Sequence, residues 1–116
     1  MSQQDFAEAI SPFFWSEHES SASVSLPVGE YKTDVFKARA DEGFEGSGYD
    51  WASLAQVFLQ EKMPQLVGTV KFDPEGSMYC AYSSDKAALK QFALAFKEAV
   101  EDEDVIHDLF SRAQLD

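Results

Sequence analysis

The sequence predicts an α+β domain in which an antiparallel sheet, built from two hairpins, packs against two main helices plus a short C-terminal helix. Three patterns support this prediction. Apolar residues alternate with polar ones in two pairs of short segments, and turn-forming residues join each pair. Apolar residues also recur at helical spacing in two longer segments and once more near the C-terminus. Strands joined by short turns form antiparallel sheets, whose apolar face the helices can cover.

The first hairpin is expected from residues 10–17, which are rich in aromatic side chains, and residues 23–28, which alternate apolar and polar side chains. The polar residues 18–21 between them supply the turn. Pro12 and Pro27 should lie at strand ends or at a sheet edge, because proline cannot donate a hydrogen bond within a central strand pair.

The middle of the chain is expected to hold a short helix, a loop and the first main helix. Residues 31–40 fit either a short helix or a strand, and we favour the helix. Three glycines in residues 43–48 require a loop, and Asp50 follows as the expected N-cap of the first main helix. Pro64 sets the end of that helix. Its apolar residues at helical spacing are Trp51, Leu54, Ala55, Phe58 and Leu59.

The second hairpin is expected from residues 66–72 and 78–82, in which apolar residues again alternate with polar ones. The segment Asp73-Pro74-Glu75-Gly76 joins them, with proline and glycine at the second and fourth positions of a type I turn. The two hairpins together would form the antiparallel sheet.

Two further helices complete the expected domain. The second main helix follows Ser84 or Asp85 as its N-cap, and its apolar stripe faces the core. The acidic run 101–104 interrupts this stripe, and Asp102 or Asp104 is expected to cap the short final helix. The stripe consists of Leu89, Phe92, Ala93, Phe96 and Val100, and the final helix continues it with Val105, Ile106, Leu109, Phe110 and Ala113.

Composition indicates one folded domain over residues 1–116. The chain is 45% hydrophobic and 26% charged, which argues against disorder, and its length argues against two domains. A domain of this size buries roughly two-thirds of the surface that its unfolded chain exposes. Ten Phe, four Tyr and two Trp residues supply the bulk of such a core.

The charge balance narrows the range of partners. Nine Lys and Arg residues against 21 Asp and Glu give a formal net charge of -12. Phosphate backbones and anionic membrane surfaces would repel this chain, so we expect no nucleic-acid partner and no membrane partner. The acidic excess suits a basic protein partner, although solubility alone could also account for it.

The compartment is inferred from cysteine usage and from the apolar segments. The single cysteine, Cys80, cannot form an internal disulfide, so the cytoplasm is the expected location. The first residues lack the basic start and apolar run of a signal peptide. No segment approaches the roughly 18 apolar residues of a membrane-spanning helix.

The residues that could support catalysis are few. His18 and His107 lie far apart in the sequence, and two surface histidines are the favoured interpretation. Cys80 falls within an aromatic strand, where a thiol usually packs as a small hydrophobic group. The glycine loop 43–48 has no following lysine and is flanked by acids, which opposes phosphate binding. The acidic runs lack calcium-loop spacing, so no enzyme activity, cofactor or metal is predicted.

A set of motifs across most of the chain resembles the immunity protein 51 family of bacterial polymorphic-toxin systems. The resemblance is densest over residues 39–75, where the glycine-rich Gly-Tyr-Asp-Trp segment and the Asp-Pro-Glu turn are the specific parts. It implies a small cytosolic α+β protein that binds and neutralises a toxin domain, without catalysis or cofactor. The matching segments are Phe36, Arg39, Glu42-Gly43-Phe44-Glu45-Gly46, Gly48-Tyr49-Asp50-Trp51, Leu54-Ala55, Phe72-Asp73-Pro74-Glu75 and Cys80-Ala81-Tyr82-Ser83.

The resemblance transfers no toxin-contacting residues, so the binding surface is inferred from the residues themselves. Tyr49 has no evident structural task, and a tyrosine beside carboxylates on a glycine-containing loop is typical of an interface anchor, although plain surface is an equal alternative. Asp50 and Trp51 also fit purely structural roles as helix cap and core residue. The residues expected to face the toxin are Glu42, Glu45, Tyr49 and Asp50, with Asp73 and Glu75 beside them.

Two other classes of function remain open at this point. A small acidic regulatory or ligand-binding module without catalytic activity, dimeric through an exposed sheet edge, is the alternative to an immunity protein. An enzyme would require a histidine and carboxylates to meet in a cleft. The toxin-binding interpretation allows a monomer or a weak homodimer.

Overall fold

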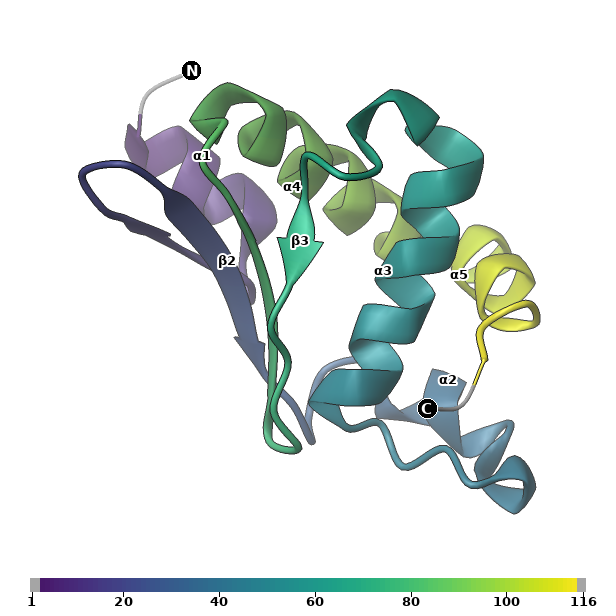
Figure 1. Cartoon of the computed structure of the whole chain (residues 1–116). Coiled ribbons are helices and arrows are strands. Elements are labelled where there is room, and N and C mark those ends of the chain that lie inside the picture. Colours follow the sequence, from purple (N-terminus) through teal and green to yellow (C-terminus); the bar gives the residue numbers. More distant parts are fainter. Residues whose placement is uncertain (1–2, 115–116) are drawn as a thin grey trace.

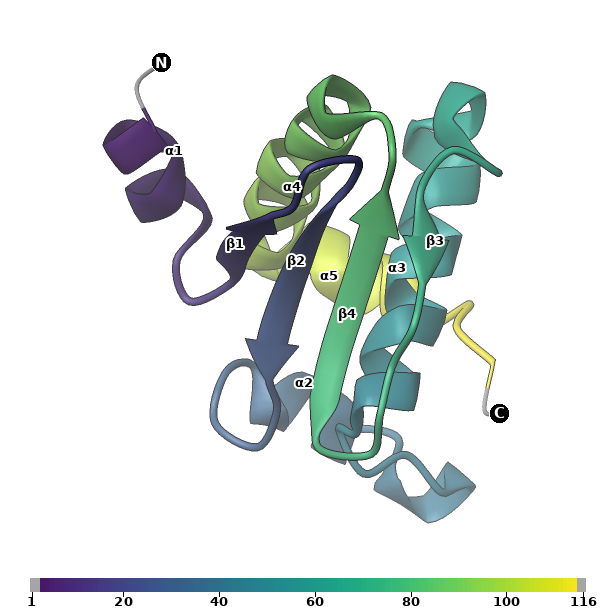
Figure 2. The same cartoon turned by 60° about the vertical axis from the view of Figure 1, so that its left-hand side comes forward.

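A four-stranded antiparallel sheet and a layer of helices against one of its faces make up the described part of the chain (Figures 1 and 2). The computed structural model describes residues 3–114. The strand order is β1-β2-β4-β3, so the expected α+β class and the two hairpins are confirmed. The strands are β1 (Phe14–Glu17), β2 (Ala22–Pro27), β3 (Lys71–Phe72) and β4 (Met78–Ser83). The helices are α1 (Gln3–Ile10), α2 (Thr33–Lys37), α3 (Gly48–Lys62), α4 (Lys86–Glu101) and α5 (Glu103–Phe110), with 3-10 turns η1 (Ala40–Glu42) and η2 (Pro64–Leu66).

The first hairpin forms as expected, but its first strand is shorter than the sequence indicated. The expected strand over residues 10–17 begins only at Phe14, because Ile10 is the last residue of α1. Phe6 and Ile10 lie one helical turn apart and are both buried, which fixes α1 as a helix. Pro27 ends β2, in agreement with the expectation that proline lies at a strand end.

The second hairpin also forms, with a shorter first strand and a displaced turn. Residues 66–70 are not a strand, because η2 and a left-handed Gly68 (φ +89°) occupy this segment. The Met78 amide donates to the Glu75 carbonyl at 3.2 Å, and the Glu75 amide donates to the Met78 carbonyl at 2.8 Å. The loop is therefore centred on Gly76 and Ser77, and the prediction of a turn centred on Pro74 and Glu75 was wrong.

The main helices occupy the expected segments, and the caps of α4 and α5 are Asp85 and Asp102, each one of the two expected alternatives. The cap of α3 differs from the prediction. Ser47 is the N-cap, and its hydroxyl accepts a hydrogen bond from the Asp50 amide at 3.3 Å. Asp50 lies three residues further on and returns its carboxylate to the Ser47 amide at 3.2 Å, which completes a capping box. The short helix favoured within residues 31–40 is α2.

Aromatic rings fill the space between the sheet and the helices. Trp51 is 1% exposed, as its expected core role requires, and its ring stacks on Tyr31 with centroids 5.9 Å apart. The Phe13 ring meets Trp51 edge-on at 5.8 Å, and Phe96 of α4 does so at 6.2 Å. Because Trp51 is in the first turn of α3, this packing fixes the start of that helix relative to the sheet.

The same core contains a polar atom whose removal should stabilise the protein. Tyr79 on β4 is fully buried, which raises the pKa of its phenol, and its hydroxyl has no hydrogen-bond partner within residues 3–114. We expect Tyr79→Phe to raise the free energy of unfolding by about 1 kcal/mol, measured by urea denaturation, because the desolvated hydroxyl is lost. Tyr82→Phe is the control, and its 38% exposed side chain should leave stability unchanged. A loss of stability in Tyr79→Phe would contradict an unpartnered hydroxyl.

Candidate functional site

The start of α3 lies directly against the β3–β4 turn. The Gly48 amide donates to the Gly76 carbonyl oxygen at 3.1 Å. A Cβ atom at Gly48 would lie 2.0 Å from the Glu75 carbonyl oxygen and 2.1 Å from that of Met78. Only a residue without a side chain fits this contact. The contact places Glu75 beside the start of α3, which carries Tyr49 and follows the loop that carries Glu45, although the two segments are well separated in the sequence.

Asp50 organises this loop from inside. Its side chain is 5% exposed, and one carboxylate oxygen accepts hydrogen bonds from the amides of Glu45, Gly46 and Ser47 at 2.8, 2.8 and 3.2 Å. Gly46 has a φ of +79°, a conformation that favours glycine. Asp50 therefore fixes the loop backbone rather than lying on the surface with its neighbours.

Glu42 is exposed, but a neighbouring cation compensates its charge. The Arg39 guanidinium donates to both Glu42 carboxylate oxygens, at 2.8 and 2.9 Å, and this bonding lowers the pKa of the Glu42 carboxyl. The same guanidinium donates to the carbonyl oxygens of Phe110 and Ala113 and lies 4.5 Å from the centroid of the Phe44 ring. Arg39 thus ties η1 to the chain that follows α5, and Glu42 is part of this clamp.

The remaining carboxylates carry uncompensated charge. Glu45, Asp73 and Glu75 are exposed, and within residues 3–114 no cation lies in ion-pair distance of them. Tyr49 is 46% exposed, which makes it one of the most exposed large aromatic side chains. We call Glu42, Glu45, Tyr49, Asp73 and Glu75 the acidic surface. An exposed phenol together with exposed carboxylates is suited to a basic protein partner.

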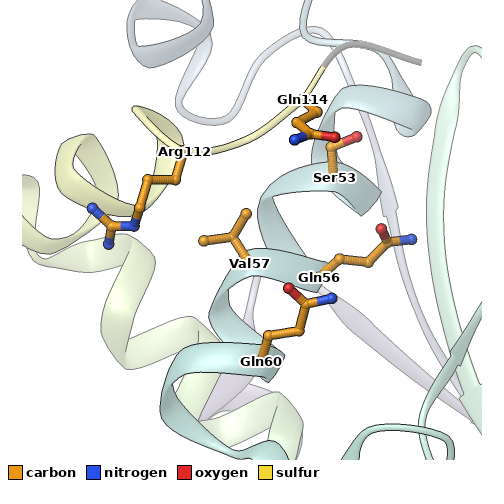
Figure 3. A pocket seen from close by; sticks show the side chains of 6 residues that line it. All are labelled: Ser53, Gln56, Val57, Gln60, Arg112 and Gln114. Atoms are coloured by element: carbon orange, nitrogen blue, oxygen red, sulfur yellow. The ribbon is translucent and has the colours of Figure 1, made fainter.

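A polar pocket, which the sequence analysis missed, lies along α3 on the same helical face as Tyr49. Ser53, Gln56 and Gln60 follow Tyr49 at helical spacing and line the pocket. The segment after α5 completes the lining, and Figure 3 shows Gln56 and Gln60 pointing away from its Arg112. In Figure 3 the Gln114 amide lies beside Ser53, and the Arg112 side chain comes from the segment after α5. Arg112 there bonds to Glu61 and Asp108 at 2.6–3.0 Å.

The pocket has a volume of about 200 Å³, and its lining is mostly uncharged and hydrogen-bonding. The signal for it in the sequence was the pair of glutamines that interrupts the apolar pattern of α3. Its lining residues are Ser53, Gln56, Val57, Gln60, Arg112 and Gln114.

The two histidines considered for catalysis lie on the surface. His18 is exposed in the β1–β2 turn, and His107 is exposed on α5 with its Nε2 3.7 Å from the Glu103 carboxylate. Within residues 3–114 no group of three His, Cys, Asp or Glu side chains is placed to hold a metal ion. Among the described helices, none has the length and apolar character needed to cross a membrane.

Comparison with known proteins gives one match. The family model described as immunity protein 51 matches residues 13–115, which include the whole acidic surface and the polar pocket. No curated protein and no solved structure matches the chain.

Proposed function

Because this chain belongs to the immunity protein 51 family, we propose that it binds a cognate bacterial toxin domain and neutralises it through the acidic surface. The observation that carries the proposal is that three exposed carboxylates, Glu45, Asp73 and Glu75, have no ion-pair partner among residues 3–114. They lie on two segments that meet at Gly48, which precedes the exposed Tyr49 in the chain. The buried Asp50 and the close contact at Gly48 hold the backbone of these segments in place. A preformed surface of this kind limits the ordering that binding would require.

The charge of the surface indicates the chemistry of the toxin. A nuclease active site is basic, because it must hold phosphate groups, so carboxylates on an inhibitor can occupy it in place of the substrate anion. A net charge of -12 would also steer a basic toxin domain toward this chain. The proposed target is therefore a basic toxin domain, with a nuclease as the best fit. Tyr49 would supply an apolar contact on the acidic surface.

The proposed site of action is the cytoplasm, where a producing cell would meet its own toxin. The single cysteine suits this reducing compartment. The chain would act by binding alone.

The direct test is binding between this chain and the C-terminal domain of a toxin-like protein encoded next to it, measured at low and moderate salt. We expect a 1:1 complex whose association rate falls as the salt concentration rises. Loss of toxin activity in the complex would establish neutralisation. An absence of binding at both salt concentrations would overturn the proposal.

Charge reversal on the acidic surface should slow association. We expect the double variant Glu45→Lys and Glu75→Lys to associate with the toxin domain about tenfold more slowly at low salt, because electrostatic steering is lost. Stopped-flow or surface-based kinetics would measure the rate. Glu42 is left unchanged, since a lysine there would face Arg39 and disturb the clamp to Phe110.

A matched control separates local from overall charge. The double variant Glu19→Lys and Glu98→Lys changes the net charge equally, at two exposed residues in the β1–β2 turn and on α4. We expect a smaller effect from this control. Equal slowing in both variants would show that net charge alone sets the association rate, and it would contradict a specific role of the acidic surface.

A further inference from the structure

Within the part of the chain that the structure describes, one face of the sheet has no helix packed against it. Figure 2 shows the four strands in front, with α3 and α4 behind them. The strand register places three rows of side chains on the uncovered side, because neighbouring residues of a strand point to opposite faces. We call six of these residues the outer sheet face: Phe14, Ser23, Ser25, Met78, Cys80 and Tyr82.

The outer sheet face differs in chemistry from the rest of the surface. None of its six side chains is charged, although Lys71, which pairs with Tyr82, points to the same side of the sheet. Phe14 is 45% exposed and Tyr82 is 38% exposed, and both are large hydrophobic residues. The small residues Ser23 and Ser25 of β2 lie between the strands that carry these two rings. An uncovered antiparallel sheet usually presents polar side chains to water, so exposed rings over a serine floor indicate a contact surface.

The acidic surface borders this face. The Asp73 amide donates to the Cys80 carbonyl at 3.0 Å, which places Asp73 at the margin beside Cys80. Glu75 pairs with Met78 at the end of the same strand pair. Lys71, opposite Tyr82 on β3, is the charged residue at the other end of this margin. An apolar centre with a charged rim is the common anatomy of protein interfaces.

We propose that the outer sheet face is a second contact surface for the toxin domain, continuous with the acidic surface. This inference rests on the proposed function and extends it. The charges around the face indicate which partner it binds. A second copy of this chain, with a net charge of -12, would place its own carboxylates against Asp73 and Glu75, and the like charges would repel. A basic toxin domain meets the same rim with opposite charge. Phe14 and Tyr82 would then be buried at the centre of the interface.

The first test uses the unmodified chain, because Cys80 is its single cysteine and lies within the outer sheet face. The rate of Cys80 alkylation by iodoacetamide is measured by mass spectrometry in the free protein and in the toxin complex. We expect slower alkylation in the complex. An unchanged rate in a saturated 1:1 complex would overturn the proposal while leaving the proposed function intact.

The second test removes the two rings. We expect the double variant Phe14→Ser and Tyr82→Ser to dissociate from the toxin domain about tenfold faster or more, with little change in association, because apolar anchors act mainly on dissociation. Val67→Ser is the control, since Val67 is 53% exposed but lies outside the sheet. Wild-type dissociation in a folded double variant would overturn the proposal.

Other outcomes are also decisive. A chain that binds no toxin domain would remove both the proposed function and this inference. A homodimer in sedimentation whose Cys80 residues are joined by a short bifunctional maleimide would assign the face to a second copy and overturn the inference.

Discussion

The Gly48→Ala variant should be destabilised by about 3 kcal/mol or more in urea denaturation, because its methyl group has no room. The added Cβ would lie 2.0 and 2.1 Å from the backbone oxygens of Glu75 and Met78. Neither oxygen belongs to a flexible side chain, so relief requires the β3–β4 turn to move away from α3. Helix propensity alone would predict the opposite change in stability, because it favours alanine over glycine by about 1 kcal/mol.

Gly76→Ala is the matched control for this prediction. A Cβ at Gly76 would have no heavy atom of residues 3–114 within 4 Å, so we expect a change within about 0.5 kcal/mol. The backbone carbonyl that accepts the Gly48 hydrogen bond is retained in this variant. Wild-type stability in Gly48→Ala would show that α3 and the turn do not touch in solution.

Asp50→Ala is the second substitution with a large expected effect, a loss of about 3 kcal/mol of unfolding free energy. Its carboxylate accepts three backbone hydrogen bonds in a site that is 5% exposed, and alanine would leave these amides without their partner. Urea denaturation measures the loss. Asp73→Ala removes an exposed carboxylate and should change stability by less than about 0.5 kcal/mol.

The conservative variant separates a structural role of Asp50 from a direct role in binding. Asp50→Asn retains an acceptor oxygen but loses the charge, so we expect a smaller loss of stability, about 1 kcal/mol. If Asp50 acts only by holding the loop, we expect the loss of toxin affinity in Asp50→Asn to be no larger than its loss of stability. A large loss of affinity at unchanged stability would instead identify Asp50 as a direct toxin contact.

The sequence predicted the long helices because their apolar residues recur over many turns. It missed α1, whose inward face is marked by only Phe6 and Ile10, while the following aromatic residues favoured extending a strand backwards. Both Pro74-Glu75 and Gly76-Ser77 are suited to a turn. The turn at Gly76-Ser77 is the one that lies in close contact with Gly48. This contact joins distant parts of the chain, so a local sequence pattern could not indicate it.

The sequence predicts the acidic surface from residue type and local motif, and the structure adds the burial and the hydrogen bonds of these residues. Arg39 and Glu42 form a local i,i+3 ion pair. The Arg39 guanidinium also donates to the carbonyl oxygens of Phe110 and Ala113, 71 and 74 positions away, which no local pattern could indicate. The burial of Asp50 follows from a loop that folds back over its own carboxylate. The polar pocket beside α3 needs the segment after α5, whose position depends on the whole fold.

Around the start of α3, the residues that hold the backbone are different from the residues that are exposed. A side chain at Gly48 would overlap the backbone of the β3–β4 turn, and the Asp50 carboxylate accepts hydrogen bonds from three backbone amides. We therefore expect replacement of either residue to destabilise the fold. Glu45, Tyr49 and Glu75 are exposed, so replacing them costs little folding free energy. Under the proposed function, single mutations on the acidic surface would alter toxin recognition without first destabilising the fold.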